Sequence, residues 1–311
     1  MVTRIVFSIV TAVVRCLLLV PLVSALCACA VGGAGEGRPT VVATTTQAAD
    51  LVRNVAGSRM RVVGLLAPNS DPHEYEVRPQ DVKALAGARL VVRSGGELDN
   101  WLRGAIESAG SGAPVLDLLS RVGAEDHDPH WWQDPRRAVV AVEAIRQALT
   151  RVDPAGAAAY RRQAAGYPRR LRALDAGVAR CLSRIPPERR KLVTTHDALG
   201  YYARRYGLTV IGTVIPSLST QAQASAGDLA RLTDTIRREH VRAIFAETAV
   251  NPSVERAIAR ETGARVGRAL WADTLGPPGS GADTYTASIR ANTEAIVDGL
   301  TGGRTACRLP R

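Results

Sequence analysis

The chain has 311 residues, which is enough for one large domain or two of moderate size. Apolar residues make up 46% of it, a share that supports buried cores but is too low for a protein that crosses a membrane many times. The formal charge of +11 comes almost entirely from arginines scattered in short runs, which argues against a nucleic-acid partner.

The first 28 residues are predicted to be a leader and not part of the fold. Their apolar segment, residues 16–28, is too short for a spanning helix. It ends in "LCAC", which resembles the lipobox of bacterial lipoproteins, with Cys29 as the residue that carries diacylglycerol. We therefore expect an exported chain that is lipid-anchored at the outer face of the cell membrane, with residues 29–39 as a flexible, glycine-rich tether. An ordinary leader or a hydrophobic N-terminal anchor are the alternatives.

Strand and helix patterns alternate through residues 40–152, the predicted N-terminal lobe. Short runs rich in valine predict strands, and apolar residues at helical spacing predict helices. Asp99 and Asp134 are expected to cap helices, and Pro135 suits a first helical turn. The predicted strands are residues 40–45, 60–66, 89–95 and 113–118, and the predicted helices are residues 47–57, 78–88, 99–109 and 134–152.

One long helical pattern, residues 153–184, leads to the predicted C-terminal lobe, residues 185–311. Pro168 lies inside this helix and should kink it. The predicted strands of the second lobe are residues 191–196, 208–214, 241–247 and 264–269, and its predicted helices are residues 197–207, 225–240, 251–263 and 283–303. The alternation predicts an α/β fold, with two β/α lobes of mostly parallel sheets flanked by helices and joined by one long backbone helix.

Removal of the leader leaves three cysteines, Cys29, Cys181 and Cys307. If Cys29 is acylated, one pair remains in a compartment that permits disulfides. A bridge between Cys181 and Cys307 would tie the end of the long helix to the C-terminus. Two unpaired thiols are the alternative, because sequence does not give the distance between their Cα atoms.

Three histidines and one aspartate follow the carboxyl ends of predicted strands, where open parallel sheets gather ligand groups. His73 and His130 each close an Asp-Pro-His tripeptide, His196 ends "KLVTTH", and Asp273 lies in "LWADTLG". Facing lobes would bring the four side chains together. Three imidazoles and one carboxylate suit a tetrahedral Zn²⁺ site.

The pattern favours a metal carrier over an enzyme. The four candidates are far apart in the sequence, whereas the ligands of a structural zinc finger come in close local pairs. Four protein ligands leave no open position for a metal-bound water, and the chain has neither H-E-x-x-H nor G-x-S-x-G. We therefore expect no catalytic residues.

Three carboxylates are candidates to support the imidazoles. Asp71 and Asp128 precede the prolines of the two tripeptides, and Glu247 ends a predicted strand. Each would accept a hydrogen bond from an imidazole N–H and fix its tautomer. The alternative for Asp71 and Asp128 is that they only shape turns.

Other residues in these segments have plainer interpretations. His127 is expected to be a solvated loop residue, with an auxiliary role in metal capture as the alternative. His240 is expected at the surface at a helix end. At least one of Trp131 and Trp132 should serve ordinary packing. In the pair that follows His196, Tyr201 is expected in the core and the next tyrosine at the surface.

Four segments carry a family resemblance. "SDPHEYEVRPQDVKAL", "DPHWWQDP", "KLVTTHDALGYYARRYGL" and "LWADTLG" resemble, in order and at the usual intervals, the metal-binding lipoproteins of bacterial ABC importers for zinc and manganese, the cluster A-I (cluster 9) solute-binding proteins. The resemblance covers residues from about 40 to 303. It implies that the long helix is a rigid backbone between the lobes and that His73, His130, His196 and Asp273 are the metal ligands.

Two features bear on the choice of metal. Manganese-preferring members usually carry a carboxylate at the third ligand position, where this chain has His196, so three nitrogens and one oxygen favour zinc. The long histidine-rich loop of many zinc members is reduced here to "AEDHD". That resembles loop-less zinc carriers, some of which are loaded by a metallochaperone.

We predict a monomeric, lipid-anchored zinc-binding protein that delivers metal to the permease of an ABC importer. The first alternative is a manganese or iron carrier on the same scaffold. The second is an adhesin-like surface lipoprotein in which the metal is structural. A zinc hydrolase is a more distant third.

Overall fold

The computed structural model describes residues 37–309, and residues from Pro39 onward form one compact unit. The expected leader and residues 29–36 of the expected tether, Cys29 included, lie outside the described residues. Among the helices in the described range, none is long and apolar enough to cross a membrane.

The N-terminal half is built on a four-stranded parallel sheet in the order β2-β1-β3-β4. Its strands are β1 (Thr40–Ala43), β2 (Arg61–Gly64), β3 (Ala88–Arg93) and β4 (Val115–Asp117). The central strands are buried on both faces, as their continuous valine runs require. Val41 and Val92 face one core cluster, and Val42 and Val91 face the other.

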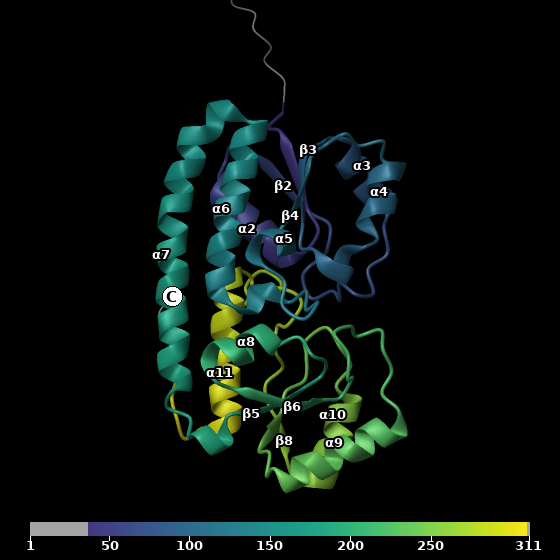
Figure 1. Ribbon diagram of the computed structural model, residues 1–311, viewed down its shortest axis with the longest axis vertical. Helices are drawn as coiled ribbons and strands as arrows, with labels where there is room; N and C mark the ends of the chain where they lie inside the picture. Colours follow the sequence, from purple (N-terminus) through teal and green to yellow (C-terminus); the bar gives the residue numbers. More distant parts are fainter. Residues whose placement is uncertain (1–36, 310–311) are drawn as a thin grey trace, which may run out of the picture. The chain divides into compact units, whose positions relative to one another are not determined.

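Helices cover both faces of this sheet (Figure 1). On one side lie α2 (Thr46–Ala56) and α6 (Pro135–Val152). On the other side lie α3 (Pro79–Ala86) and α4 (Leu102–Ser108). A short helix, α5 (Leu119–Val122), follows β4 and was not predicted.

The strands of the C-terminal half are shorter than predicted. Two parallel pairs form, β5 (Lys191–Thr194) with β6 (Thr209–Thr213), and β7 (Ala243–Ile244) with β8 (Arg265–Val266). An isolated parallel bridge from Thr194 to Phe245 continues the ladder between the two pairs. The helices of this half are α8 (Gly200–Tyr206), α9 (Ala226–Arg238), α10 (Ser253–Thr262) and α11 (Tyr285–Thr301).

The long helix α7 (Ala157–Leu182) follows a 3-10 turn at Pro154–Gly156 and continues through Pro168. It runs alongside both halves, with α6 and α11 between it and the sheets (Figure 1). A mostly parallel α/β fold with a long helix is therefore confirmed. The division into lobes on either side of residues 153–184 stays a prediction.

A disulfide joins Cys181, in the last turn of α7, to Cys307, with a Cα–Cα distance of 5.5 Å. The two residues lie 126 positions apart in the sequence. The bridge therefore closes a loop that contains the whole C-terminal half.

Two local predictions were wrong. Asp99 does not cap α4 but ends a 3-10 helix, where its buried carboxylate accepts hydrogen bonds from the hydroxyl of Thr44 and the backbone N–H of Ser94. Tyr202 is buried and not at the surface, and its hydroxyl lies 2.8 Å from that of Thr293. Tyr202 lies on the buried side of α8 with Tyr201, Ala203 and Tyr206, whereas Arg204 is exposed. The cap predicted at Asp134 is confirmed, and the helix predicted over residues 225–240 begins with Ser225 as its N-cap.

Candidate metal centre

The four candidate ligands meet in one place. One ligand atom from each of His73, His130, His196 and Asp273 lies within 4.8 Å of the others. His73 lies in the loop after β2, and His130 immediately precedes the 3-10 turn Trp131–Gln133. The other two residues come from the C-terminal half, after β5 and after β8. The centre therefore exists only when the two halves are packed together.

The imidazole nitrogens converge on the carboxylate of Asp273. Its Oδ2 lies 3.1 Å from Nε2 of His196 and 3.3 Å from Nε2 of His73, and its Oδ1 lies 3.5 Å from Nε2 of His130. The imidazoles of His130 and His196 are fully buried, and the side chain of His73 is 6% exposed. The centre is therefore a small cluster of donors that is largely closed to solvent.

Three of these donor atoms make no hydrogen bond, although all are buried. They are Nε2 of His73 and both carboxylate oxygens of Asp273. Buried polar atoms without a partner are uncommon, because their desolvation is then uncompensated. A cation among the four side chains would give each of these atoms a partner, so the donor set fits a bound metal ion.

Two carboxylates orient two of the imidazoles. Oδ1 of Asp128 lies 2.7 Å from Nδ1 of His130, and Oε1 of Glu247 lies 2.7 Å from Nδ1 of His196. An Nδ1–H that donates to a carboxylate leaves the Nε2 lone pair free to bind a metal. Because both carboxylates are almost fully buried, the two rings are held with little freedom.

The carboxylates also set the proton affinity of the metal-free centre. Burial lowers the pKa of His196, but the charges of Asp273 and Glu247 outweigh it and raise that pKa well above its usual value. Burial raises the pKa of Asp273, and the imidazoles of His196 and His130 reverse this and hold it well below its usual value. Electrostatics therefore favours an ionised Asp273, the form that binds a metal.

Asp71 takes the alternative role that the sequence left open, which is to shape the turn at His73. Its Oδ1 accepts the backbone N–H of His73 and not the imidazole N–H, and its Oδ2 accepts the hydroxyl of Thr220. The side chain of Gln221 donates to the backbone carbonyl of His73 at 2.6 Å. The loop of His73 is thus held by residues from the C-terminal half, a contact that no local sequence pattern predicted.

We expect removal of both contacts, in a Thr220→Val and Gln221→Ala double variant, to speed metal dissociation by up to about thirtyfold. Each hydrogen bond contributes about 1 kcal/mol net, and the loop of His73 opens more readily without them. Stopped-flow transfer of the metal to a chelator measures the rate. Gln147→Ala, an exposed glutamine on α6, is the control. An unchanged rate in the double variant would mean that these contacts do not limit release.

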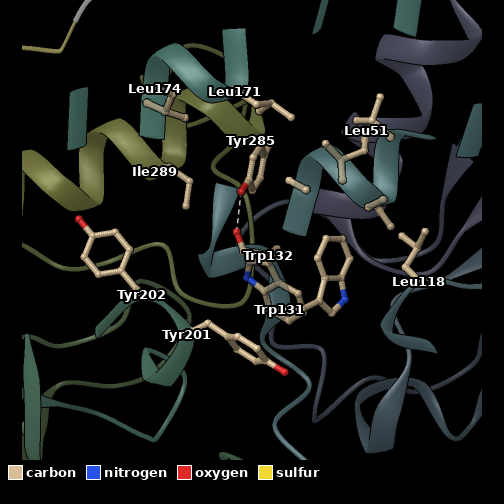
Figure 2. Close-up of a cluster of buried hydrophobic side chains, with 14 of the residues drawn as sticks. Leu51, Leu118, Trp131, Trp132, Leu171, Leu174, Tyr201, Tyr202, Tyr285 and Ile289 are labelled. Carbon is tan, nitrogen blue, oxygen red and sulfur yellow. Dashed lines mark hydrogen bonds between the residues drawn. The ribbon is translucent and has the colours of Figure 1, made fainter. Parts of the chain in front are cut away.

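The backbone next to Asp273 is fixed from the N-terminal half. The side chains of Trp132 and Gln133 both donate to the carbonyl of Ala272, at 2.9 and 2.7 Å. Figure 2 shows Trp132 within a buried cluster, where its own carbonyl accepts the hydroxyl of Tyr285 at 2.6 Å. Both tryptophans are fully buried, as expected of packing residues, and Trp132 also holds the backbone next to Asp273.

The remaining histidines lie outside the cluster. His127 and His240 are exposed, and neither belongs to the group of close donors found among the described residues. Both have positive φ, at 62° and 51°, in turns. The predicted surface positions of both residues are therefore confirmed.

Comparison with known proteins places this fold and donor set in a family. The model of the ZnuA family, described as "Zinc-uptake complex component A periplasmic", matches residues 41–299. The zinc-binding protein TroA of Treponema pallidum is 34% identical over 281 residues, which cover 86% of this chain and 90% of TroA. The solved structure of TroA superposes with a TM-score of 0.80 at 30% identity and covers 85% of this chain and 99% of that one.

Relatives that are named for other metals are about equally similar. The manganese-binding lipoprotein MntA of Halalkalibacterium halodurans is 30% identical over 86% of this chain and 89% of its own length. The iron-binding protein YfeA of Yersinia pestis is 31% identical over 84% of this chain and 86% of its own. The family resemblance is thus confirmed across the whole described fold, and the chain belongs to the ZnuA family of metal-binding proteins of ABC importers.

Proposed function

We propose that this chain binds one transition-metal ion outside the cytoplasm and delivers it to the permease of an ABC importer, with zinc as the preferred cargo. The observation that carries the proposal is the buried cluster of three imidazole nitrogens and one carboxylate, in which three donor atoms lack hydrogen bonds. We propose His73, His130, His196 and Asp273 as the ligands, with Asp128 and Glu247 orienting two of the imidazoles.

The donor set supports zinc over manganese. Imidazole nitrogens suit zinc and iron, whereas manganese favours oxygen donors and a higher coordination number. Four donors this close together suit a tetrahedral ion. Relatives named for zinc, manganese and iron resemble the chain about equally, so the preference rests on the ligands and not on the relatives.

The proposed cell location follows the leader and the relatives. MntA is named a lipoprotein, which supports acylation of Cys29 here and a position at the outer face of the cell membrane. We propose that the anchored chain is a monomer. The short loop around His127 supports loading by a metallochaperone. With four protein donors on the ion, no coordination position stays open for a catalytic water, so we propose transport and no catalysis.

Metal competition tests the choice of zinc. The full-length chain is stripped with a chelator, offered equimolar zinc and manganese, and examined by native mass spectrometry. We expect one zinc per chain that excess manganese does not displace. His196→Asp is the matched variant, and we expect it to shift the balance toward manganese by supplying a second carboxylate. Manganese retained against zinc by the natural chain would overturn the zinc assignment, and no bound metal would overturn the site.

Chelation also separates a carrier from a surface protein with a structural metal. A structural zinc contributes directly to folding, so its removal unfolds the protein. Here the large apolar cores and the disulfide are independent of the metal centre. We therefore expect unchanged circular dichroism after metal removal, and unfolding in chelator would favour the structural role.

A further inference from the structure

The outward side of α7 carries a row of five arginines. They are Arg161, Arg162, Arg169, Arg172 and Arg180, and all five are exposed. At 3.6 residues per turn, the five positions fall within an arc of about 100°, and they span about 29 Å along the helix. This arginine row lies on the longest helix of the described fold, on the side opposite its buried residues.

Nothing in the described part of the protein neutralises the arginine row. None of the five guanidinium groups forms an ion pair, a hydrogen bond or a ring contact with the described residues. The one carboxylate of α7, Asp175, is buried and bound by Arg205 and Tyr206. Arg170 lies off the row, and its guanidinium stacks 5.0 Å from the ring of Tyr167.

The residues between the arginines are small. Ala158, Ala165 and Ala176 are exposed on the same side of the helix as the row. Short side chains leave the guanidinium groups as the outermost atoms, so a flat partner would meet all five. Guanidinium groups bind phosphate oxygens through paired hydrogen bonds, and a helix in its folded position holds them in a fixed row.

We propose that the arginine row is a docking surface for an anionic lipid bilayer, on which the protein rests with α7 along the membrane. The proposal uses the extracytoplasmic location from the proposed function, but it does not depend on the metal centre. Phospholipid headgroups are the anionic surface nearest to a lipid-anchored chain. Basic residues near such a surface each strengthen binding by roughly fivefold.

The place where the described fold begins supports a lipid bilayer as the partner. The carbonyl of Pro39 accepts the N–H of Arg61, and Arg59 pairs with Asp153, which precedes the 3-10 turn that leads into α7. The described fold therefore begins beside the amino-terminal end of α7. The ten or so residues between Cys29 and Pro39 reach at most about 35 Å, so an acylated Cys29 would keep this end of the helix close to the bilayer.

Arginine modification tests the proposal on the full-length, acylated protein. The protein is anchored in vesicles of phosphatidylcholine, with or without phosphatidylglycerol, and treated with phenylglyoxal, and peptide mapping gives the modification rate of each arginine. We expect roughly fivefold slower modification of the row on anionic vesicles, and no change for the exposed Arg231 on α9. Salt of about 1 M, which shortens the screening length to about 3 Å, should remove this difference in modification rate between the two kinds of vesicle.

A variant pair tests whether the row acts as a unit. In a variant with Arg162→Gln, Arg169→Gln and Arg172→Gln, we expect Arg161 and Arg180 to be modified at the same rate on neutral and anionic vesicles. In the Arg170→Gln variant, their modification should remain slower on anionic vesicles. Glutamine is a good helix former, so α7 should stay intact, which circular dichroism checks.

The experiment separates a failure of the proposed docking surface from a failure of the proposed metal centre. Equal modification rates on neutral and anionic vesicles would overturn the proposal, and so would protection by a soluble polyanion but not by anionic vesicles. Zinc binding is measured in the same samples. Loss of protection with intact zinc binding would overturn the docking surface alone, and protection without zinc binding would overturn the proposed cargo alone.

Discussion

His196→Ala is expected to weaken zinc binding by at least about 100-fold while the metal-free protein stays folded. The substitution removes one of four donors and leaves the buried carboxylate of Glu247 without its imidazole partner. Loss of an outer partner alone costs about ten- to hundredfold in metal affinity, so loss of the ligand with its partner should cost more. A competition titration with a zinc-binding dye measures the affinity.

Glu247→Gln provides a graded comparison for this prediction. Its amide can still accept from Nδ1 of His196 but carries no charge, so we expect a loss within about ten- to hundredfold, smaller than that of His196→Ala. His240→Ala, which removes an exposed histidine far from the cluster, should leave the affinity unchanged. If His196→Ala bound zinc as tightly as the natural chain, His196 would not be a ligand and the proposed set of four ligands would be wrong.

The candidate ligands were predictable because each carries a strong local signal. His73 and His130 follow proline in a repeated tripeptide, and His196 and Asp273 follow apolar strands. Parallel strands place their carboxyl ends at one edge, so strand order alone brings such residues into a cleft. The alternation of strands and helices predicted the fold for the same reason, because each element has its own periodicity.

The supporting contacts were not predictable because they are long-range. Thr220 meets Asp71 across 149 positions, and Gln221 meets the loop of His73 across 148. Neither residue lies in a pattern that differs from an ordinary surface loop. The same limit applies to Tyr202, which is buried and whose hydroxyl meets that of Thr293 on α11, 91 positions away.

The asymmetry among the three imidazoles has a consequence for the transport cycle. Each of the two fully buried rings, those of His130 and His196, is held by a carboxylate within its own half of the protein. The backbone of the third, His73, is held by Gln221 directly and by Thr220 through Asp71, and the contacts of Gln221 and Thr220 cross between the halves. Separation of the halves would therefore free the loop of His73 and leave the other two imidazoles oriented for the next ion.

Removal of the disulfide is expected to have the largest effect on stability. In a Cys181→Ala and Cys307→Ala double variant, the crosslink across 126 positions is lost. The chain-entropy model assigns a loop of this length up to about 5 kcal/mol, because the open chain has far more unfolded conformations, and measured losses usually fall below that limit. We expect urea unfolding to show a loss of about 3–5 kcal/mol.

The double variant also tells whether the bridge serves the metal centre or only the fold. The imidazoles and Asp273 are held by hydrogen bonds and packing that do not involve either cysteine. Zinc affinity at a temperature where the variant is folded should therefore match that of the natural chain. The natural chain in reducing conditions should unfold at the same urea concentration as the variant. If its unfolding midpoint did not move on reduction, the bridge would not contribute to the stability of the folded chain.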